Sequence, residues 1–280
     1  MMADDVDELL ARLEQEAPPP SGVLSYGREP QQFGHLRLPD AEEAGPGPYP
    51  LVIVIHGGYW RARYDLGYFG AACGALGRLG LATWNIEYRR MGDPGGGWPG
   101  TLEDVATAAD FARSLAQAYP LDLGRVVTLG HSAGGHLALW LAARPRLPEH
   151  SQFWRPDPLP LAGVVSLAGV TDLRRAWELG LSDNAAGLLI GGSPDDFPFR
   201  YDEASPYEAL PLRVRQVLLH GDADANVPIE LSARYAERAR ALGDNVMFVT
   251  LPGAEHFEPV NPETGEWRDV ERWTRELAGR

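Results

Sequence analysis

Residues Gly130-His131-Ser132-Ala133-Gly134-Gly135-His136 directly follow the apolar run Val126 to Leu129. They place the serine in a Gly-x-Ser-x-Gly frame, between a predicted buried strand and residues 133–143, which predict a helix. The turn between the two must be tight enough to push the serine hydroxyl outward, and a side chain at either end of the frame would obstruct it. This context favours a nucleophilic serine over a glycine-rich loop with a surface serine.

A serine nucleophile also needs an acid and a histidine, and the sequence supplies both after later strand-like runs. Asp222 and Asp224 follow one such run, and His256 follows the next. In an open α/β sheet, the loops at the carboxyl ends of the strands meet at one edge, where ligands bind. We therefore expect Ser132, an acid and His256 to form a catalytic set, in the chain order Ser, Asp, His.

A further glycine-rich segment, His56-Gly57-Gly58-Tyr59-Trp60, follows the apolar run 51–55. It matches the early loop that lends backbone N–H groups to an oxyanion hole. We expect the oxyanion donors to come from Ala133 and from Gly58 or Tyr59, each worth roughly 3 kcal/mol of barrier. Which of the last two amides points inward stays open.

The motifs together resemble the α/β-hydrolase superfamily, and within it the kynurenine formamidase (arylformamidase) and small carboxylesterase branch. Similar segments are Ser25-Tyr26-Gly27, His56 to Arg61, Asn85 to Arg89, Gly130 to Leu137, Gly169 to Leu173, Ala204-Ser205-Pro206 and those around His220 and His256. The His-Gly-x-x-Asp-x-x-Val-Pro pattern of the superfamily implies that Asp224, rather than Asp222, orients His256, with Asp172 as a weaker rival. One departure is His35, which stands where the branch has an aspartate.

The resemblance implies a serine hydrolase that cleaves a small ester or aryl formamide through an acyl-enzyme intermediate, with N-formylkynurenine as one substrate. A broad short-chain carboxylesterase is the alternative, because the same triad serves both chemistries. A different class is a hydrolase-fold protein that binds a ligand without catalysis. No cofactor is expected.

Composition narrows these classes further. The 280 residues, 44% of them hydrophobic, suit one α/β-hydrolase domain over residues 21–280, after an amphipathic helix and proline linker over residues 1–20. The 39 acidic and 25 basic residues give a net charge of −14, which repels nucleic acids and anionic membranes. The sequence contains no lysine, which excludes Schiff-base, lysine-held pyridoxal phosphate and Walker-type chemistry. The single cysteine, Cys73, predicts a buried inert thiol.

The amino-terminal segment lacks a basic region and a long apolar core, so it is not a secretory signal, and no stretch reaches membrane-spanning length. We therefore expect a cytoplasmic protein. Val6, Leu9, Leu10 and Leu13 recur at helical spacing and predict a short amphipathic helix. It is expected to dock on the body of the domain or on a partner subunit in a homodimer.

Strand-like and helical stretches alternate along the chain, which predicts an α/β fold with a mostly parallel sheet covered on both faces. Strands are expected at 51–55, 81–86, 126–129, 161–167, 214–219 and 246–251, and helices near 68–79, 101–118, 133–143, 229–242 and 263–278. Two aromatic-containing insertions, residues 144–160 and 174–211, interrupt this rhythm. They are either lids over the site or surface loops packed by their own aromatics.

Side chains beside the oxyanion loop are the predicted substrate contacts. Tyr59 and Trp60 are expected to form one wall of the acyl or aryl pocket. Arg61 and Arg63 are expected either to receive a substrate carboxylate or to pair with acidic surface residues. We expect no metal, because the acidic cluster that follows His220 lacks ligand spacing.

Overall fold

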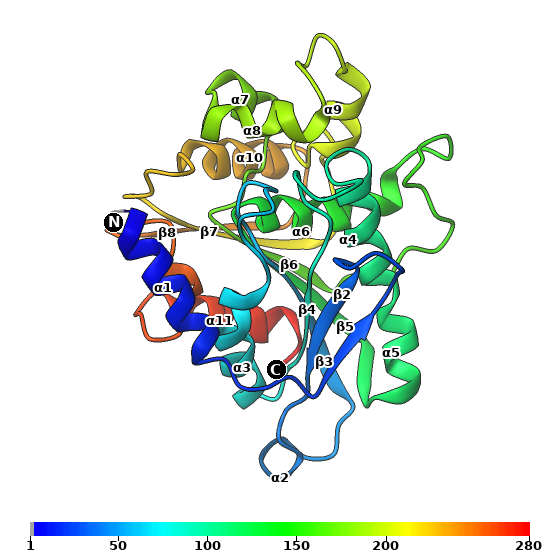
Figure 1. Cartoon of the computed structure of the whole chain (residues 1–280), viewed down its shortest axis with the longest axis vertical. Coiled ribbons are helices and arrows are strands. Elements are labelled where there is room, and N and C mark those ends of the chain that lie inside the picture. The colour runs from blue at the N-terminus through cyan, green and yellow to red at the C-terminus, as the bar shows by residue number, and fades with distance from the viewer. Residues whose placement is uncertain (1–2) are drawn as a thin grey trace.

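One twisted sheet organises the chain, in the strand order β1-β2-β4-β3-β5-β6-β7-β8 (Figure 1). The strands are β1 (Gly22–Ser25), β2 (Phe33–Arg37), β3 (Tyr49–Ile55), β4 (Ala82–Ile86), β5 (Leu121–His131), β6 (Gly163–Leu167), β7 (Arg215–Gly221) and β8 (Val246–Leu251). Strands β3 to β8 pair in parallel, whereas β1 and β2 pair antiparallel with their neighbours. This computed structural model describes residues 3–280, so residues 1 and 2 of the predicted amino-terminal segment lie outside it.

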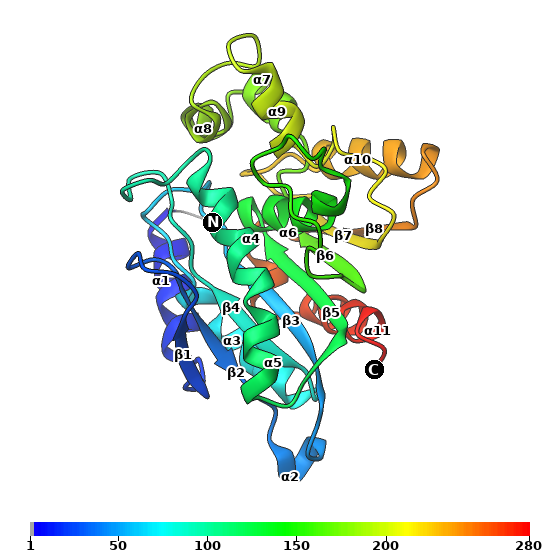
Figure 2. The same ribbon diagram turned by 90° about the vertical axis from the view of Figure 1, so that its right-hand side faces the viewer.

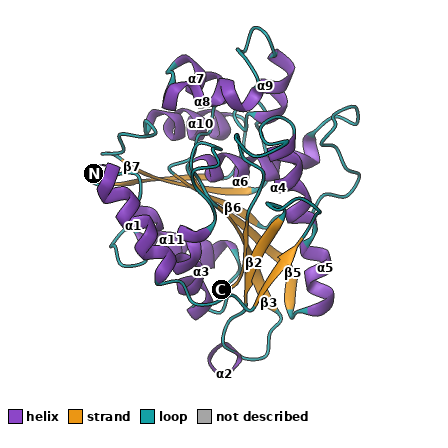
Figure 3. Cartoon of the chain, viewed as in Figure 1, coloured by secondary structure: helices purple, strands orange, loops and turns teal. Residues whose placement is uncertain are grey.

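Helices cover both faces of this sheet, as Figures 2 and 3 show. They are α1 (Ala3–Gln15), α2 (Ala41–Ala44), α3 (Gly70–Arg78), α4 (Gly100–Asp110), α5 (Ala112–Ala118), α6 (Ala133–Ala143), α7 (Leu173–Glu178), α8 (Leu181–Ile190), α9 (Pro198–Ala204), α10 (Glu230–Ala241) and α11 (Trp267–Leu277), with short 3₁₀ turns η1 (Gly67–Phe69), η2 (Arg144–Arg146) and η3 (Glu258–Val260). The predicted α/β fold with a mostly parallel sheet is confirmed.

Two hydrophobic cores form because side chains alternate across each buried strand. In β3, Leu51, Ile53 and Ile55 face the core under α4, α5, α6 and α10. Val52 and Val54 face the opposite core, which α1, α3 and α11 cover. The run 51–55 is therefore apolar throughout because both of its faces are buried.

The antiparallel pair β1–β2 was not among the predicted strands. Gly34 and His35 interrupt the apolar pattern of β2. The glycine is required because a Cβ at position 34 would lie 2.6 Å from the Trp84 ring. Packing against a neighbouring strand, rather than local sequence preference, makes this segment a strand.

Helix α1 docks on its own chain, against η1 and α3. Leu10 and Leu13 are buried there, as the helical spacing predicted. The segment that follows α1 packs closely against α3 because two positions of α3 are glycine. A Cβ at Gly70 would lie 2.4 Å from the Ala17 side chain, and one at Gly74 would lie 2.6 Å from Pro18. Within residues 3–280, no helix is long and apolar enough to cross a bilayer.

The turn from β5 to α6 is held by backbone packing. A Cβ at Gly130 would lie 2.0 Å from the Gly134 carbonyl oxygen, and a Cβ at Gly134 would lie 2.0 Å from the carbonyl oxygen of Ile55. Backbone atoms cannot swing aside as the end of a long side chain can. The start of α6 therefore sits directly against β3 only because both positions are glycine.

Gly134→Ala should lower the free energy of unfolding by about 2 kcal/mol or more, since the new methyl group overlaps backbone atoms. The matched control is Gly77→Ala in helix α3, where nothing lies within 4 Å of the added Cβ. That variant should be more stable than the wild type by about 0.5–1 kcal/mol. Urea unfolding followed by circular dichroism measures both, and equal stability of the two variants would contradict this account of the turn.

Candidate active site

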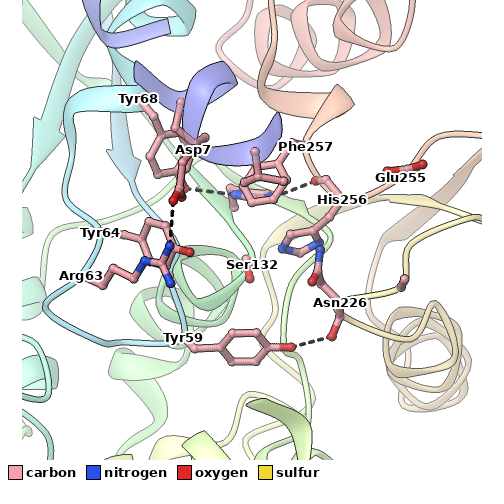
Figure 4. A pocket seen from close by; sticks show the side chains of 15 residues that line it. Asp7, Tyr59, Arg63, Tyr64, Tyr68, Ser132, Asn226, Glu255, His256 and Phe257 are labelled. Carbon is pink, nitrogen blue, oxygen red and sulfur yellow. Dashed lines mark hydrogen bonds and ion pairs between the residues drawn. The ribbon is translucent and has the colours of Figure 1, made fainter. Parts of the chain in front are cut away.

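Ser132 sits at the turn between β5 and α6 in a strained backbone conformation. Its φ is +56° and its ψ is −120°, which only a few per cent of residues other than glycine approach. The Ser132 N–H donates to the Leu167 carbonyl at the end of β6, at 2.8 Å. The serine side chain points into a pocket of about 300 Å³, where it lies beside the His256 ring (Figure 4).

His256 is held by a buried carboxylate. The distance from its Nδ1 to Asp224 Oδ2 is 2.7 Å, and the Asp224 side chain is fully buried. The other carboxylate oxygen, Oδ1, accepts the N–H groups of Asn226 and Val227, at 2.8 and 2.9 Å. This arrangement fixes the imidazole with Nδ1–H toward the acid and leaves Nε2 for a reacting group.

The pKa of the Asp224 carboxyl lies well below its usual range. Burial alone would raise this pKa, but hydrogen bonds from His220 and His256, the charge of His256 and the Val227 N–H outweigh burial and lower it. The carboxylate is therefore ionised wherever the protein is folded near neutral pH. An ionised acid in this position is suited to stabilise positive charge on a neighbouring imidazole.

The two rival aspartates lie elsewhere. Asp222 is exposed and its Oδ1 accepts the Gly253 N–H at 2.6 Å. Asp172 caps α7 by accepting the Arg175 N–H, and burial raises its pKa. Of the three candidates, the structure brings Asp224 to His256.

A hydrogen-bonded chain joins the glycine loop to the His256 loop. The Gly57 N–H donates to the Tyr68 hydroxyl at 2.6 Å, and that hydroxyl lies 3.0 Å from His131 Nδ1. His131 Nε2 lies 2.9 Å from the His256 carbonyl oxygen. Burial holds the pKa of His131 well below its usual value, so the ring is neutral and its Nε2–H donates. Tyr68 was not predicted to belong to the site, because nothing local in the sequence marks it.

The predicted oxyanion donors surround Ser132. Gly58 and Tyr59 line the pocket, and Ala133 follows the serine at the first position of α6. The Gly57 N–H already donates to Tyr68, which leaves the N–H groups of Gly58 and Tyr59 as the predicted donors of this loop. Gly58, Tyr59 and Trp60 have φ values of +103°, +50° and +57°, a left-handed run that turns the loop sharply around the pocket.

Of the predicted substrate contacts Tyr59, Trp60 and Arg61, only Tyr59 lines the Ser132 pocket. Tyr59 lines the pocket, and its hydroxyl donates to the Asn226 carbonyl across it, at 2.5 Å (Figure 4). The expectation for Trp60 is corrected: its ring is fully buried and donates from Nε1 to His136 Nδ1 at 3.2 Å. Arg61 does not line the Ser132 pocket; it lines a second pocket, where it donates to the Ser182 carbonyl at 2.5 Å.

Helix α1 supplies a wall that was not predicted. Val6, Asp7 and Leu10 line the Ser132 pocket together with Tyr64 and other aromatic side chains. Asp7 forms an ion pair with Arg63 at 2.8 Å at the rim, as Figure 4 shows. This pairing is one of the two roles expected of Arg63. The apolar stripe predicted that α1 docks, but not that it docks beside the serine.

Neither insertion lines the Ser132 pocket among the described residues. In residues 144–160, Arg144 forms an ion pair with Asp110 and Phe153 packs edge-on against Trp140. Residues 174–211 hold most of α7 and all of α8 and α9, which lie beyond α10 in Figure 1.

Among the side chains that the structure describes, no group of three or more histidine, cysteine or acidic residues is placed to hold a metal ion.

The sheet order, and a serine held at the turn after β5, define the α/β-hydrolase fold. The chain belongs to the BD-FAE family, which matches residues 37–238. Esterase LipC of Mycobacterium tuberculosis is 28% identical over 244 residues, covering 82% of this chain and 58% of that protein. Kynurenine formamidase of Drosophila melanogaster is 25% identical over 239 residues, covering 81% of this chain and 73% of that protein.

Solved structures share the fold. Esterase B from Lactobacillus rhamnosis superposes with a TM-score of 0.80 at 21% identity, over 99% of this chain and 92% of that one. A truncated carbohydrate esterase from gut microbiota gives a TM-score of 0.78 at 22% identity, over 95% of this chain and 98% of that one. These likenesses show the α/β-hydrolase fold, and together with the family match and the curated relatives they confirm the resemblance to the α/β-hydrolase superfamily.

Buried His136 should make the fold sensitive to acid. Burial lowers its pKa to about 4, below the ordinary value of 6.5, so its contribution to stability is complete above pH 6.5 and is lost as the pH falls through about 4. The loss should reach a slope of about 1.4 kcal/mol per pH unit, and His136→Gln should remove it. Urea unfolding between pH 7 and 4 measures the slope, with exposed His150→Gln as control. An unchanged slope in His136→Gln would contradict the prediction.

Proposed function

We propose that the chain is a serine hydrolase in which Ser132 is the nucleophile, His256 the general base and acid, and Asp224 the orienting carboxylate. The observation that carries the proposal is the 2.7 Å contact between His256 Nδ1 and Asp224 Oδ2, beside a serine held in a strained turn. Strained backbone persists where the surrounding structure over-determines it, which is common at reacting groups.

The reaction follows from this arrangement. His256 Nε2 takes the proton of the Ser132 hydroxyl as Oγ attacks the substrate carbonyl carbon. The oxyanion of the tetrahedral intermediate accepts N–H groups from Ala133 and from Gly58 or Tyr59. His256 then protonates the leaving alcohol or amine, whose bond to the carbonyl carbon breaks. Water attacks the acyl-enzyme by the reverse steps, and Ser132 is regenerated.

The proposed substrate is a small ester or an aryl formamide. The pocket of about 300 Å³ has aromatic and aliphatic walls from Tyr64, Tyr68, Phe257 and α1, which suit a compact apolar group. The names of the relatives, an esterase and a kynurenine formamidase, point to the same two chemistries. N-formylkynurenine is the formamide to test, and short-chain esters are the alternative.

The substrate test compares hydrolysis of N-formylkynurenine with a series of p-nitrophenyl esters, with Ser132→Ala as control. A formamidase should favour the formamide by orders of magnitude in kcat/KM, whereas a carboxylesterase should cleave only the short esters. Ser132→Ala should lose both activities. Wild-type protein that cleaves neither would favour the non-catalytic ligand-binding alternative.

Asp224→Asn should lower kcat by about 10⁴-fold, because the amide no longer holds His256 in the reactive tautomer. Asp222→Asn is the matched control in the same loop: its carboxylate is exposed and contacts the Gly253 N–H, so kcat should stay near the wild-type value. Initial rates on the best ester measure both. Equal rates for the two variants would move the acid role away from Asp224.

Val6 of α1 should set the size of the acyl group. Val6→Ala widens the pocket, so the kcat/KM ratio of p-nitrophenyl hexanoate to acetate should rise about tenfold, and Val6→Trp should lower it by a similar factor. Val23→Trp on β1, where the side chain is 61% exposed, is the control. A ratio that is the same in both Val6 variants would show that α1 does not bound the acyl site.

A further inference from the structure

A second pocket, of about 590 Å³, adjoins the Ser132 pocket. It lies between the loop from Met91 to Trp98 and the end of α8. Arg63 lines both pockets, so they meet at this side chain. The insertion 174–211, one of the two candidate lids, instead builds the far wall of this neighbouring pocket.

The charged side chains that line the second pocket are all arginines. They are Arg61, Arg63 and Arg200, and among the described residues no carboxylate lines the pocket. This is notable in a chain with a net charge of −14. A cavity lined by charge of one sign attracts ligands of the opposite sign.

Two of these guanidinium groups have no acidic partner among the side chains that the structure describes. Arg61 Nη2 donates to the Ser182 carbonyl at 2.5 Å, and Arg200 Nη1 donates to the Ile190 carbonyl at 2.8 Å. The Arg61 Nε–H is buried without an acceptor among the described residues. Arg200 also lies over the Phe197 ring, 4.1 Å from its centroid. Both cations are therefore positioned by the fold but not neutralised by it.

The remaining walls are apolar and preformed. Met91, Trp98 and residues 188–190 line the pocket, and Leu188 is 59% exposed at its edge. Backbone hydrogen bonds fix the walls to each other: the Trp98 N–H donates to the Leu189 carbonyl at 2.8 Å, and the Ala62 N–H donates to the Met91 carbonyl at 3.0 Å. A preformed wall lowers the entropy that a ligand loses on binding.

We propose that this second pocket binds a carboxylate carried on an apolar or aromatic body. A guanidinium presents paired N–H donors that match the two oxygens of a carboxylate, and the apolar walls accept the body. The bound group would be the anionic end of a substrate whose ester or formamide carbonyl lies at Ser132. That last step rests on the proposed function, whereas anion binding in the pocket does not.

The kinetic test uses acetate esters of 4-hydroxybenzoate, 4-hydroxyphenylacetate and 3-(4-hydroxyphenyl)propionate, each compared with its primary amide. At the chain length that spans the two pockets, kcat/KM for the acid should exceed that for the amide by about tenfold. Arg200→Gln should bring this ratio to about one, and Arg78→Gln, an exposed arginine of α3 outside both pockets, should leave it unchanged. Wild-type ratios near one at all three lengths would overturn the proposal that the bound carboxylate is the anionic end of a substrate cleaved at Ser132.

A binding test separates the pocket from catalysis. Calorimetry with Ser132→Ala protein should show that 3-(4-hydroxyphenyl)propionate binds about tenfold more tightly than its amide, and that adding Arg200→Gln removes the difference. Equal affinity for acid and amide in Ser132→Ala would overturn the pocket proposal even if esters are hydrolysed. Preferential acid binding in a protein that hydrolyses no ester would uphold the pocket and refute the proposed function.

Discussion

The close approach of helix α6 to strand β3 is the constraint on which the site depends. Gly134 lets the first turn of α6 lie against the Ile55 carbonyl, where a Cβ would be 2.0 Å from the oxygen. The turn between β5 and α6 must therefore be tight, and Ser132 adopts a strained backbone conformation there, with φ of +56°. The same approach brings the glycine loop after β3 beside the serine. The proposed nucleophile and the predicted oxyanion donors are thus placed by a single backbone contact.

A second set of interactions ties this turn to the loops from β7 and β8. Asp224 holds His256 from one side, and the His131 ring holds the His256 carbonyl from the other. His131 is in turn bonded to Tyr68, which accepts from Gly57. These groups therefore form one connected hydrogen-bond network, which rigidifies a buried region more than separate bonds would. Helix α1 forms a further wall of the pocket but supplies none of these hydrogen-bonded groups.

The sequence predicted the parallel strands, and the structure brings Asp224, the acid that the superfamily resemblance implied, to His256. Strands buried on both faces must be apolar throughout, and the polar loops at their ends meet at one edge of the sheet. The antiparallel strands β1 and β2 were not predicted, because the glycine at position 34 is required by its contact with the Trp84 ring, and the local sequence does not reveal that contact. Trp60 was misplaced, and Arg61 lines the second pocket rather than the Ser132 pocket, because a left-handed run over residues 58–60 decides which way the chain points after the glycine loop. Tyr68 and α1 enter the site through tertiary packing.

The most direct test of the central claim is reaction of the wild-type protein with a fluorophosphonate, followed by peptide mass spectrometry. A serine activated by His256 should be modified stoichiometrically at Ser132. The modification should not occur in His256→Ala, although that variant keeps the serine in its turn. Labelling at another residue, or equal labelling of Ser132 in the two proteins, would contradict the account.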